Sequence, residues 1–300
     1  MRSERDSMTS TPTVSIIFPA KNEGENVRKT LQSLYEVKTH VTFEAIVVDD
    51  ASSDRCCEFL TDPASPYSAV TCVRTDGVGA ANARNVGAEH AKGSYYVFCD
   101  AHVSFEDWWL DRLLRPILLK KTDAICPAIA STSNAKSIGY GMSLKPDLSV
   151  LWNKEQPSLF ETPILPGGCL MMAADVFHAI GGFERGFRRW GHEDVEISIK
   201  LWLFGYRCSC EPSVTILHVF RKKQPYAISQ THVDYNLIRM AYSHFNVLRI
   251  KRCLKLLKHS DPTQVKQDVI NHGALEQRQQ YEALRKHNDS WFFSKFSIPF

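Results

Sequence analysis

The chain has 300 residues, of which 44% are hydrophobic and 23% are charged. This ordinary globular composition excludes the disordered, collagen-like and membrane-spanning classes, and no apolar run reaches the ~18 residues that a transmembrane helix needs. The formal net charge of +3 is unevenly distributed, because residues 221–300 hold 14 Lys/Arg and 6 Asp/Glu whereas residues 1–220 hold 22 and 27. The basic C-terminal part is therefore a separate feature of the chain.

The first half of the chain alternates short apolar runs with helical segments. This order indicates βαβ units and an α/β fold with a mostly parallel sheet flanked by helices. Ligands bind such sheets at the carboxyl ends of the strands, where Pro19, Asp50 and Asp100 are expected to lie. The expected strands are 14–18, 45–48, 70–73, 95–99 and 124–129, and the expected helices are 26–34, 80–91 and 108–119.

The second half is less regular. Residues 131–163 are rich in Ser, Asn, Lys and Pro, which predicts a long loop. Helices are expected at 175–180 and 193–204, and a strand at 214–217 leads to His218.

The C-terminal part is expected to be helical. Residues 234–258 have the pattern of a basic amphipathic helix, with an apolar stripe that contains Ile238, Tyr242, Phe245 and Leu248. Its charge suits peripheral contact with an anionic membrane or an acidic partner. The favoured alternative is a solvated helix that packs on the rest of the protein.

The tail and the cysteines bear on the compartment. Residues 1–12 are polar and charged, so we expect a disordered tail without a signal peptide. The nine cysteines are an odd number, and they lack zinc-type spacing. Free thiols fit a reduced cytoplasm, which is the expected location.

Two predicted strand ends carry residues that can bind a metal ion. Asp100 and His102 are two residues apart after one apolar strand, and His218 follows another. A carboxylate together with imidazoles suits Mn²⁺ or a similar divalent ion, which would hold a diphosphate and stabilise its developing charge. The alternatives are that Asp100 begins a turn beside a surface histidine and that His218 binds no metal.

Three further segments have residues suited to a ligand site. The cations at 221–223 are typical of a phosphate-facing segment, or of a solvated basic loop. The paired glycines at 167–168 permit close backbone approach to a ligand, or form a plain turn. Glu193 and Asp194 fall in the first turn of a helix, where the dipole favours ionised carboxylates and where acids also serve simply as caps.

Taken together, these segments resemble family 2 glycosyltransferases and, more closely, the catalytic domain of polypeptide N-acetylgalactosaminyltransferases. The resemblance runs from about residue 14 to about residue 245 and rests on shared order and spacing, since each segment alone is weak. The segments that carry it are Phe-Pro-Ala-Lys-Asn-Glu at 18–23, Val-Val-Asp-Asp-Ala-Ser-Ser-Asp at 47–54, Ala-Arg-Asn-Val-Gly-Ala at 83–88, Asp-Ala-His at 100–102, Pro-Gly-Gly at 166–168, Trp-Gly-His-Glu-Asp-Val-Glu-Ile-Ser at 190–198, His-Val-Phe-Arg-Lys at 218–222 and Pro-Tyr at 225–226.

The resemblance implies a GT-A nucleotide-diphospho-sugar transferase fold for residues 13–232. The pattern and charge of residues 233–300 predict a helical basic extension after it. It implies a metal site, a donor site and a catalytic acid pair. The implied residues are Asp100, His102 and His218 as Mn²⁺ ligands; Asp50 on the uracil; the Pro19 backbone, Ala20 and Glu23 in the nucleoside pocket; Arg84 as a further donor contact; Arg221 and Tyr226 on a mobile lid over the phosphates; Gly168, Trp190 and Glu193 beside the donor sugar; and Asp194, with Glu193, as the catalytic pair.

The implied activity is transfer of a hexose or N-acetylhexosamine from a UDP-sugar. The partners are then a nucleotide-sugar donor and an unidentified acceptor, which is a glycan, a peptide or a lipid-linked molecule, with no role for nucleic acid. Two departures from the polypeptide transferases are visible. Those enzymes have an arginine that begins the loop at the position of Gly77, and they carry a ricin-like lectin domain where residues 246–300 are predicted to be helical and basic. A protein acceptor therefore does not follow.

The residue after Glu193 predicts the stereochemistry. The polypeptide transferases retain the anomeric configuration and have Asn at this position, whereas this chain has Asp194. In inverting family 2 enzymes an aspartate here acts as the general base, and a carboxylate accepts a proton where an amide does not. We therefore expect inversion, with a dipole-stabilised, ionised Asp194 as the base. A retaining N-acetylgalactosaminyltransferase-like enzyme, in which Asp194 only caps the helix, is the alternative.

Two other classes of function compete with this one. Gly77-Val78-Gly79 would suit a dinucleotide oxidoreductase, but Asn82 stands where that fingerprint needs a small residue. A non-catalytic, nucleotide-sugar-binding relative is the second, although no residue of the predicted metal and base sites is missing.

Overall fold

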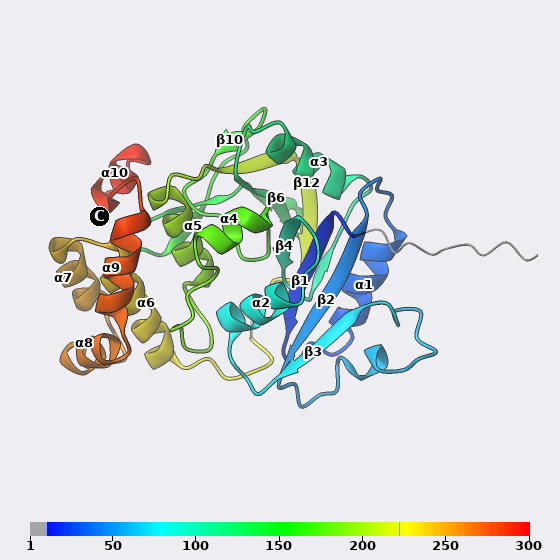
Figure 1. The fold of residues 1–300 in the computed structure, drawn as a ribbon, viewed down its shortest axis with the longest axis horizontal. Coiled ribbons are helices and arrows are strands. Elements are labelled where there is room, and N and C mark those ends of the chain that lie inside the picture. Colours follow the sequence, from blue (N-terminus) through cyan, green and yellow to red (C-terminus); the bar gives the residue numbers. More distant parts are fainter. Residues whose placement is uncertain (1–10, 222) are drawn as a thin grey trace, which may run out of the picture.

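The computed structural model describes residues 11–221 and 223–300. Within them, ten strands form one central sheet in the order β10-β12-β6-β11-β4-β1-β2-β3, with β5 added beside β12 and β7 beside β6 (Figure 1). The strands of this sheet are β1 Val14–Ala20, β2 Phe43–Asp50, β3 Thr71–Thr75, β4 Tyr95–Cys99, β5 Val103–Ser104, β6 Ala124–Ser131, β7 Asn134–Gly139, β10 Phe160–Glu161, β11 Cys169–Ala173 and β12 Cys208–His218.

The N-terminal half has the predicted parallel βαβ arrangement. Strands β1, β2, β3 and β4 pair in parallel, and each lies within a few residues of its predicted bounds. Ile17 of β1 packs in one core while Ile16 and Phe18 pack in the other, because successive side chains of a strand point to opposite faces. The sheet is therefore covered on both faces, as the near-continuous apolar runs predict.

Different helices cover the two faces of the sheet. Helices α1 (Asn26–Glu36) and α3 (Trp109–Leu118) contribute to one core, and α2 (Ala80–Glu89), α4 (Ala174–Ala179) and α5 (Glu193–Leu203) contribute to the other. Close packing of α2 depends on a small residue. A Cβ on Gly87 would lie 2.3 Å from Ile17 Cγ2, so a larger residue would push α2 away from β1.

The second half makes the sheet mixed. Strand β11 runs antiparallel between β4 and β6, whereas β12 is parallel to β6. The predicted long loop at 131–163 is wrong, because this stretch contains β7 and β10 of the main sheet and a hairpin of β8 (Met142–Leu144) and β9 (Val150–Trp152). Sequence patterns miss such short, largely exposed strands because they carry little hydrophobic periodicity.

The C-terminal residues form helices that gather at one end of the molecule, away from β3 and α1 (Figure 1). These helices are α6 Gln230–His244, α7 Val247–Leu256, α8 Pro262–Asn271, α9 Ala274–Leu284 and α10 Asp289–Lys295. Their apolar side chains belong to the same core cluster as α2, α4 and α5. The boundary proposed at residue 233 stays a prediction.

The single basic helix predicted at 234–258 is wrong in two respects. The chain breaks between α6 and α7, where Asn246 caps α7 by accepting a hydrogen bond from Arg249 N. Helix α6 is buried along residues 234–244, whereas Leu248 is 70% exposed, so the predicted stripe does not continue into α7. Of these two helices, only α7 therefore presents an exposed basic surface.

Buried charges join α5 to the C-terminal helices. Glu196 of α5 pairs with Lys200 on the same helix, with 3.1 Å between Oε1 and Nζ, and with His244 of α6 at 2.8 Å. All three side chains are fully buried. Removing one partner from such a cluster typically costs about 3–5 kcal/mol, because an unpaired charge stays buried.

The cysteines and the N-terminal tail bear on the predicted compartment. All nine cysteines lie in described residues and are free thiols, as expected; the cytoplasmic location itself stays a prediction. Of the tail predicted at 1–12, residues 1–10 lie outside the described residues. Among the described helices, none combines the length and apolarity that crossing a membrane requires.

Candidate active site

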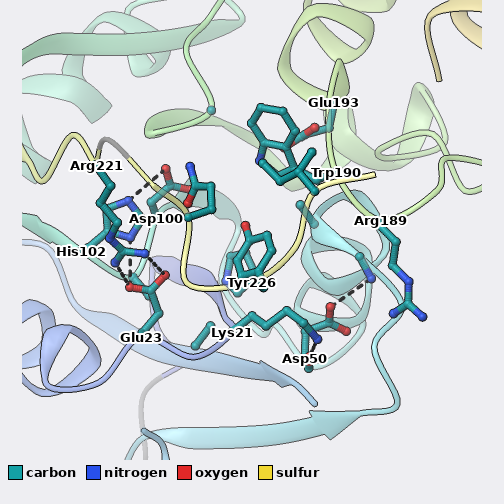
Figure 2. Close-up of a pocket in the computed structure, with 18 of the residues that line it drawn as sticks. Lys21, Glu23, Asp50, Asp100, His102, Arg189, Trp190, Glu193, Arg221 and Tyr226 are labelled. Atoms are coloured by element: carbon teal, nitrogen blue, oxygen red, sulfur yellow. Dashed lines mark hydrogen bonds and ion pairs between the residues drawn. The ribbon is translucent and has the colours of Figure 1, made fainter. Parts of the chain in front are cut away.

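A cavity of about 610 Å³ opens at the carboxyl ends of β1, β2 and β4. All fourteen residues that the sequence singled out line it. Figure 2 shows Glu23, Asp100 and His102 toward one end of this cavity, Asp50 and Arg189 toward the other, and Tyr226 between them. The strand ends therefore meet at a cavity, which is where the strand-end rule places a ligand site.

Three potential metal ligands converge at one end of the cavity. One ligand atom from each of Asp100, His102 and His218 lies within 4.8 Å of the others. His218 Nε2 is 3.1 Å from Asp100 Oδ2, and His102 Nε2 is 3.9 Å from the same oxygen. The donor set of one carboxylate and two imidazoles suits a divalent transition metal such as Mn²⁺.

Sheet pairing brings these ligands together. Asp100 directly follows β4, and its backbone N–H donates to Gly168 O at 3.2 Å. His218 ends β12 in register with Val103 of β5, and Val219 N donates to His102 O at 3.1 Å. The two histidines, 116 residues apart in the chain, are therefore neighbours because β5 pairs with β12.

Arg84 lies between the potential metal ligands and the acid pair. It is 3% exposed, and its Nη2 lies 2.9 Å from Asp100 Oδ1 while its Nη1 lies 3.7 Å from Glu193 Oε1. Burial alone would raise the pKa of Asp100. The hydrogen bond with His218 and the charges of His102 and Arg84 outweigh burial and hold that pKa below its ordinary value.

The acid pair begins α5. Asp194 Oδ2 accepts from Gly167 N at 3.3 Å, and Glu193 Oε2 accepts from Gly191 N at 2.9 Å. Burial raises the pKa of Glu193 to about 6, with Arg84 opposing the shift. Burial also raises the pKa of Asp194 against the backbone N–H groups that lower it. The expected lowering by the helix dipole is therefore outweighed, and desolvation decides the direction.

Asp50 holds a backbone turn at the opposite end of the cavity. Its Oδ1 accepts from Thr75 Oγ1 at 2.7 Å and from Val78 N at 2.6 Å, and its Oδ2 accepts from Gly79 N at 3.1 Å. The carboxylate thus shapes the turn between β3 and α2 and still faces the cavity. Its predicted contact with a uracil would use an oxygen lone pair that these three hydrogen bonds leave free.

Arg221 and Tyr226 lie on the segment between β12 and α6. Both terminal guanidinium nitrogens of Arg221 donate to the Glu23 carboxylate, with Nη1 3.1 Å from Oε1. Burial would raise the pKa of Glu23, but hydrogen bonds with His102 and Arg221 leave it below its ordinary value. Burial and the charges of Asp100, Glu193 and Glu23 raise the pKa of Tyr226 to about 12. Lys222, in the predicted basic run, lies outside the described residues.

Sequence reasoning missed several cavity residues. Lys21 donates from Nζ to Asp50 O at 2.6 Å, and Arg189 donates to Gly77 O. Both lie in or beside motifs that the sequence singled out, which is the signal that would have found them. His232 of α6 also lines the cavity, and no motif marks it.

The comparison with known families decides the assignment. The family model described as "Glycosyl transferase family 2" matches residues 15–181. The chain belongs to glycosyl transferase family 2. A second family model, described as "N-terminal domain of galactosyltransferase", matches residues 159–224. The two models together extend from β1 past the potential metal ligand His218.

Curated relatives of this family 2 chain include polypeptide N-acetylgalactosaminyltransferases. Polypeptide N-acetylgalactosaminyltransferase 11 from Xenopus tropicalis is 32% identical over 181 residues, which cover 55% of the chain and 30% of the relative. Polypeptide N-acetylgalactosaminyltransferase 3 from Homo sapiens is 30% identical over 259 residues, which cover 77% of the chain and 40% of the relative. The chain thus spans less than half the length of these relatives.

A solved structure confirms the predicted GT-A fold of the family 2 chain. The crystal structure of GalNAc-T7 with UDP, GalNAc and Mn²⁺ superposes with a TM-score of 0.73 at 20% sequence identity. The match covers 96% of this chain and 57% of the other. Because the sequence identity is only 20%, this likeness concerns the fold alone. The family assignment, in turn, excludes the alternative interpretation as a dinucleotide oxidoreductase.

Proposed function

We propose that this chain is a Mn²⁺-dependent, inverting glycosyltransferase that moves a sugar from a UDP-sugar to an acceptor. One observation carries the proposal: the three metal ligands and the acid pair face a single cavity, and the buried Arg84 lies between them. Family membership supports a sugar donor. The structure of GalNAc-T7 with UDP and Mn²⁺ supports the choice of nucleotide and metal.

The donor diphosphate would lie at the metal-ligand end. A bound Mn²⁺ supplies positive charge that stabilises the leaving nucleotide. Asp100, His102 and His218 would hold it, and the donor set fits, because one carboxylate oxygen and two imidazole nitrogens lie within 4.8 Å of one another. Arg221 would exchange its contact with Glu23 for the phosphates, since guanidinium pairs with phosphate oxygens.

The acceptor would be activated at the start of α5. Asp194 would take the proton from the attacking hydroxyl while that hydroxyl displaces the nucleotide from the opposite face of the sugar ring. Its raised pKa makes it a stronger base than an ordinary aspartate. Glu193 and Trp190 would contact the donor sugar, and Asp50, Pro19 and Ala20 the nucleoside.

A retaining reaction is the second candidate. The similarity of this chain to polypeptide N-acetylgalactosaminyltransferases favours it, because that resemblance implies that the anomeric configuration of the sugar is retained. Asp194, in place of the asparagine of those enzymes, is the residue that argues for inversion. The two candidates differ in the anomer of the product.

A donor screen tests the proposal directly. The full chain is incubated with Mn²⁺ and a panel of UDP-sugars that includes UDP-GalNAc and UDP-GlcNAc, and release of free UDP is measured with glycan, peptide and lipid-linked acceptors. Turnover with one donor and a β-linked product by proton NMR is the expected result. UDP binding without turnover of any donor would instead support a non-catalytic relative.

A further inference from the structure

The segment that precedes α5 has an unusual backbone. Arg189, Gly191 and His192 have φ values of 47°, 108° and 68°. Left-handed conformations are unfavourable for residues that carry a Cβ, such as Arg189 and His192, so contacts around the segment must stabilise them.

Asn236 of α6 makes many of these contacts. Its Nδ2 donates to Arg188 O at 2.9 Å, Gly191 O at 2.9 Å and Trp190 O at 3.3 Å, while its Oδ1 accepts from Arg188 N at 2.7 Å. The side chain is 1% exposed, so water does not compete for these bonds. A single buried amide therefore bonds four backbone groups of the segment.

The turn before α2 holds the segment from the opposite side. Ala80 N donates to Arg189 O at 2.7 Å. A Cβ on Gly79 would lie 2.4 Å from the same oxygen, so this approach requires glycine. The segment is thus held between α6 and the turn that Asp50 shapes.

The held segment leads into the catalytic acids. Trp190 lines the cavity, and Gly191 N donates to Glu193 Oε2. We propose that Asn236 is a positioning residue for sugar transfer, which fixes the backbone from which Trp190, Glu193 and Asp194 reach the donor sugar. This inference rests on the proposed function, and it makes α6 of the C-terminal region a structural part of the active site.

Two substitutions separate this role from simple stability. Asn236→Ala removes all four bonds, and Asn236→Asp keeps the shape and the Oδ1 acceptor but removes the N–H donors. The matched control is Asn246→Ala, which removes a part-buried helix-capping bond in the same helical region without touching the segment. If Asn236→Ala fails to fold, Asn236→Asp carries the test.

We expect kcat to fall about 10- to 100-fold in both Asn236 variants, because small misplacements of catalytic groups have effects of this size. The Kd for UDP in Mn²⁺ should stay within about twofold of the wild type, since the metal and nucleoside contacts are elsewhere. Unchanged kcat in a folded Asn236 variant, or an equal loss in Asn246→Ala, would overturn the inference.

Hydrogen exchange provides a readout that does not depend on activity. Peptides that contain residues 188–193 should exchange faster in the Asn236 variants than in the wild type and in Asn246→Ala. If the wild type transfers no sugar from any donor, the proposed function fails by itself, and equal exchange in all proteins would separately overturn the positioning role.

Discussion

The metal-ligand end of the cavity and the acid-bearing turn reach their positions by different means. Asp100, His102 and His218 sit at strand ends whose places follow from sheet pairing. Glu193 and Asp194 follow a segment with left-handed backbone that a helix and a turn hold from outside the sheet. The first end is therefore suited to binding and the second to turnover, and substitutions should separate the two.

The largest expected effect is at the metal-ligand end. His218→Ala should abolish turnover and weaken UDP binding in Mn²⁺, because it would remove one of the three proposed ligands of the divalent ion. Turnover assays and calorimetric titration with UDP measure both, and His102→Ala should behave alike. His259→Ala, an exposed histidine of the C-terminal region, is the control. Full activity in excess EDTA would remove the metal from the mechanism.

The next effect is at the acid-bearing turn. Asp194→Asn should lose turnover by ~10² or more, the usual scale for a general base, and should keep its affinity for UDP. The same change at Asp175, an exposed acid in the first turn of α4, should leave turnover unaltered. A fully active Asp194→Asn would show that this carboxylate only caps α5, and an α-linked product would contradict inversion.

A smaller effect is expected from pH. The acid pair has raised pKa values, with that of Glu193 at about 6, and a base must be ionised to accept a proton. Activity should therefore be lost as pH falls, and the acid limb of kcat/KM should lie above the pH at which ordinary carboxyl groups titrate. A profile measured at constant ionic strength tests this. An acid limb near pH 4, where ordinary carboxyl groups titrate, would show that burial does not govern the pair.

The smallest effect on catalysis is expected at α7. Charge reversal of exposed Lys251, Arg252 and Lys255 to Glu should leave turnover with a soluble acceptor unchanged, because α7 lies outside the cavity lining. The same variant tests the proposed membrane contact, since each cation near an anionic surface contributes about 1 kcal/mol. Co-sedimentation of the wild type alone with phosphatidylserine vesicles at low salt would support it. Failure of both proteins to bind would leave α7 as a solvated helix.

Local sequence patterns predicted the strands and helices of the N-terminal half and the order of the site motifs. They could do so because buried strands are continuous apolar runs, and because the motifs sit at the ends of these runs. They failed at the short strands between 131 and 163 and at the break between α6 and α7. There, the hydrophobic pattern is weak or continues across the boundary, so only packing against the rest of the fold selects the element.

The sequence alone was thus sufficient for the fold class and, through its resemblance to family 2 glycosyltransferases, for fourteen residues that line the cavity. Only the tertiary structure decided how those residues act on one another. The direction of the Asp194 pKa shift follows from burial, which competes with a helix dipole that the sequence does show. The contact of Asn236 with Arg188 joins residues 48 positions apart, and no local pattern encodes such a bond because it exists only after α6 has packed against the segment before α5.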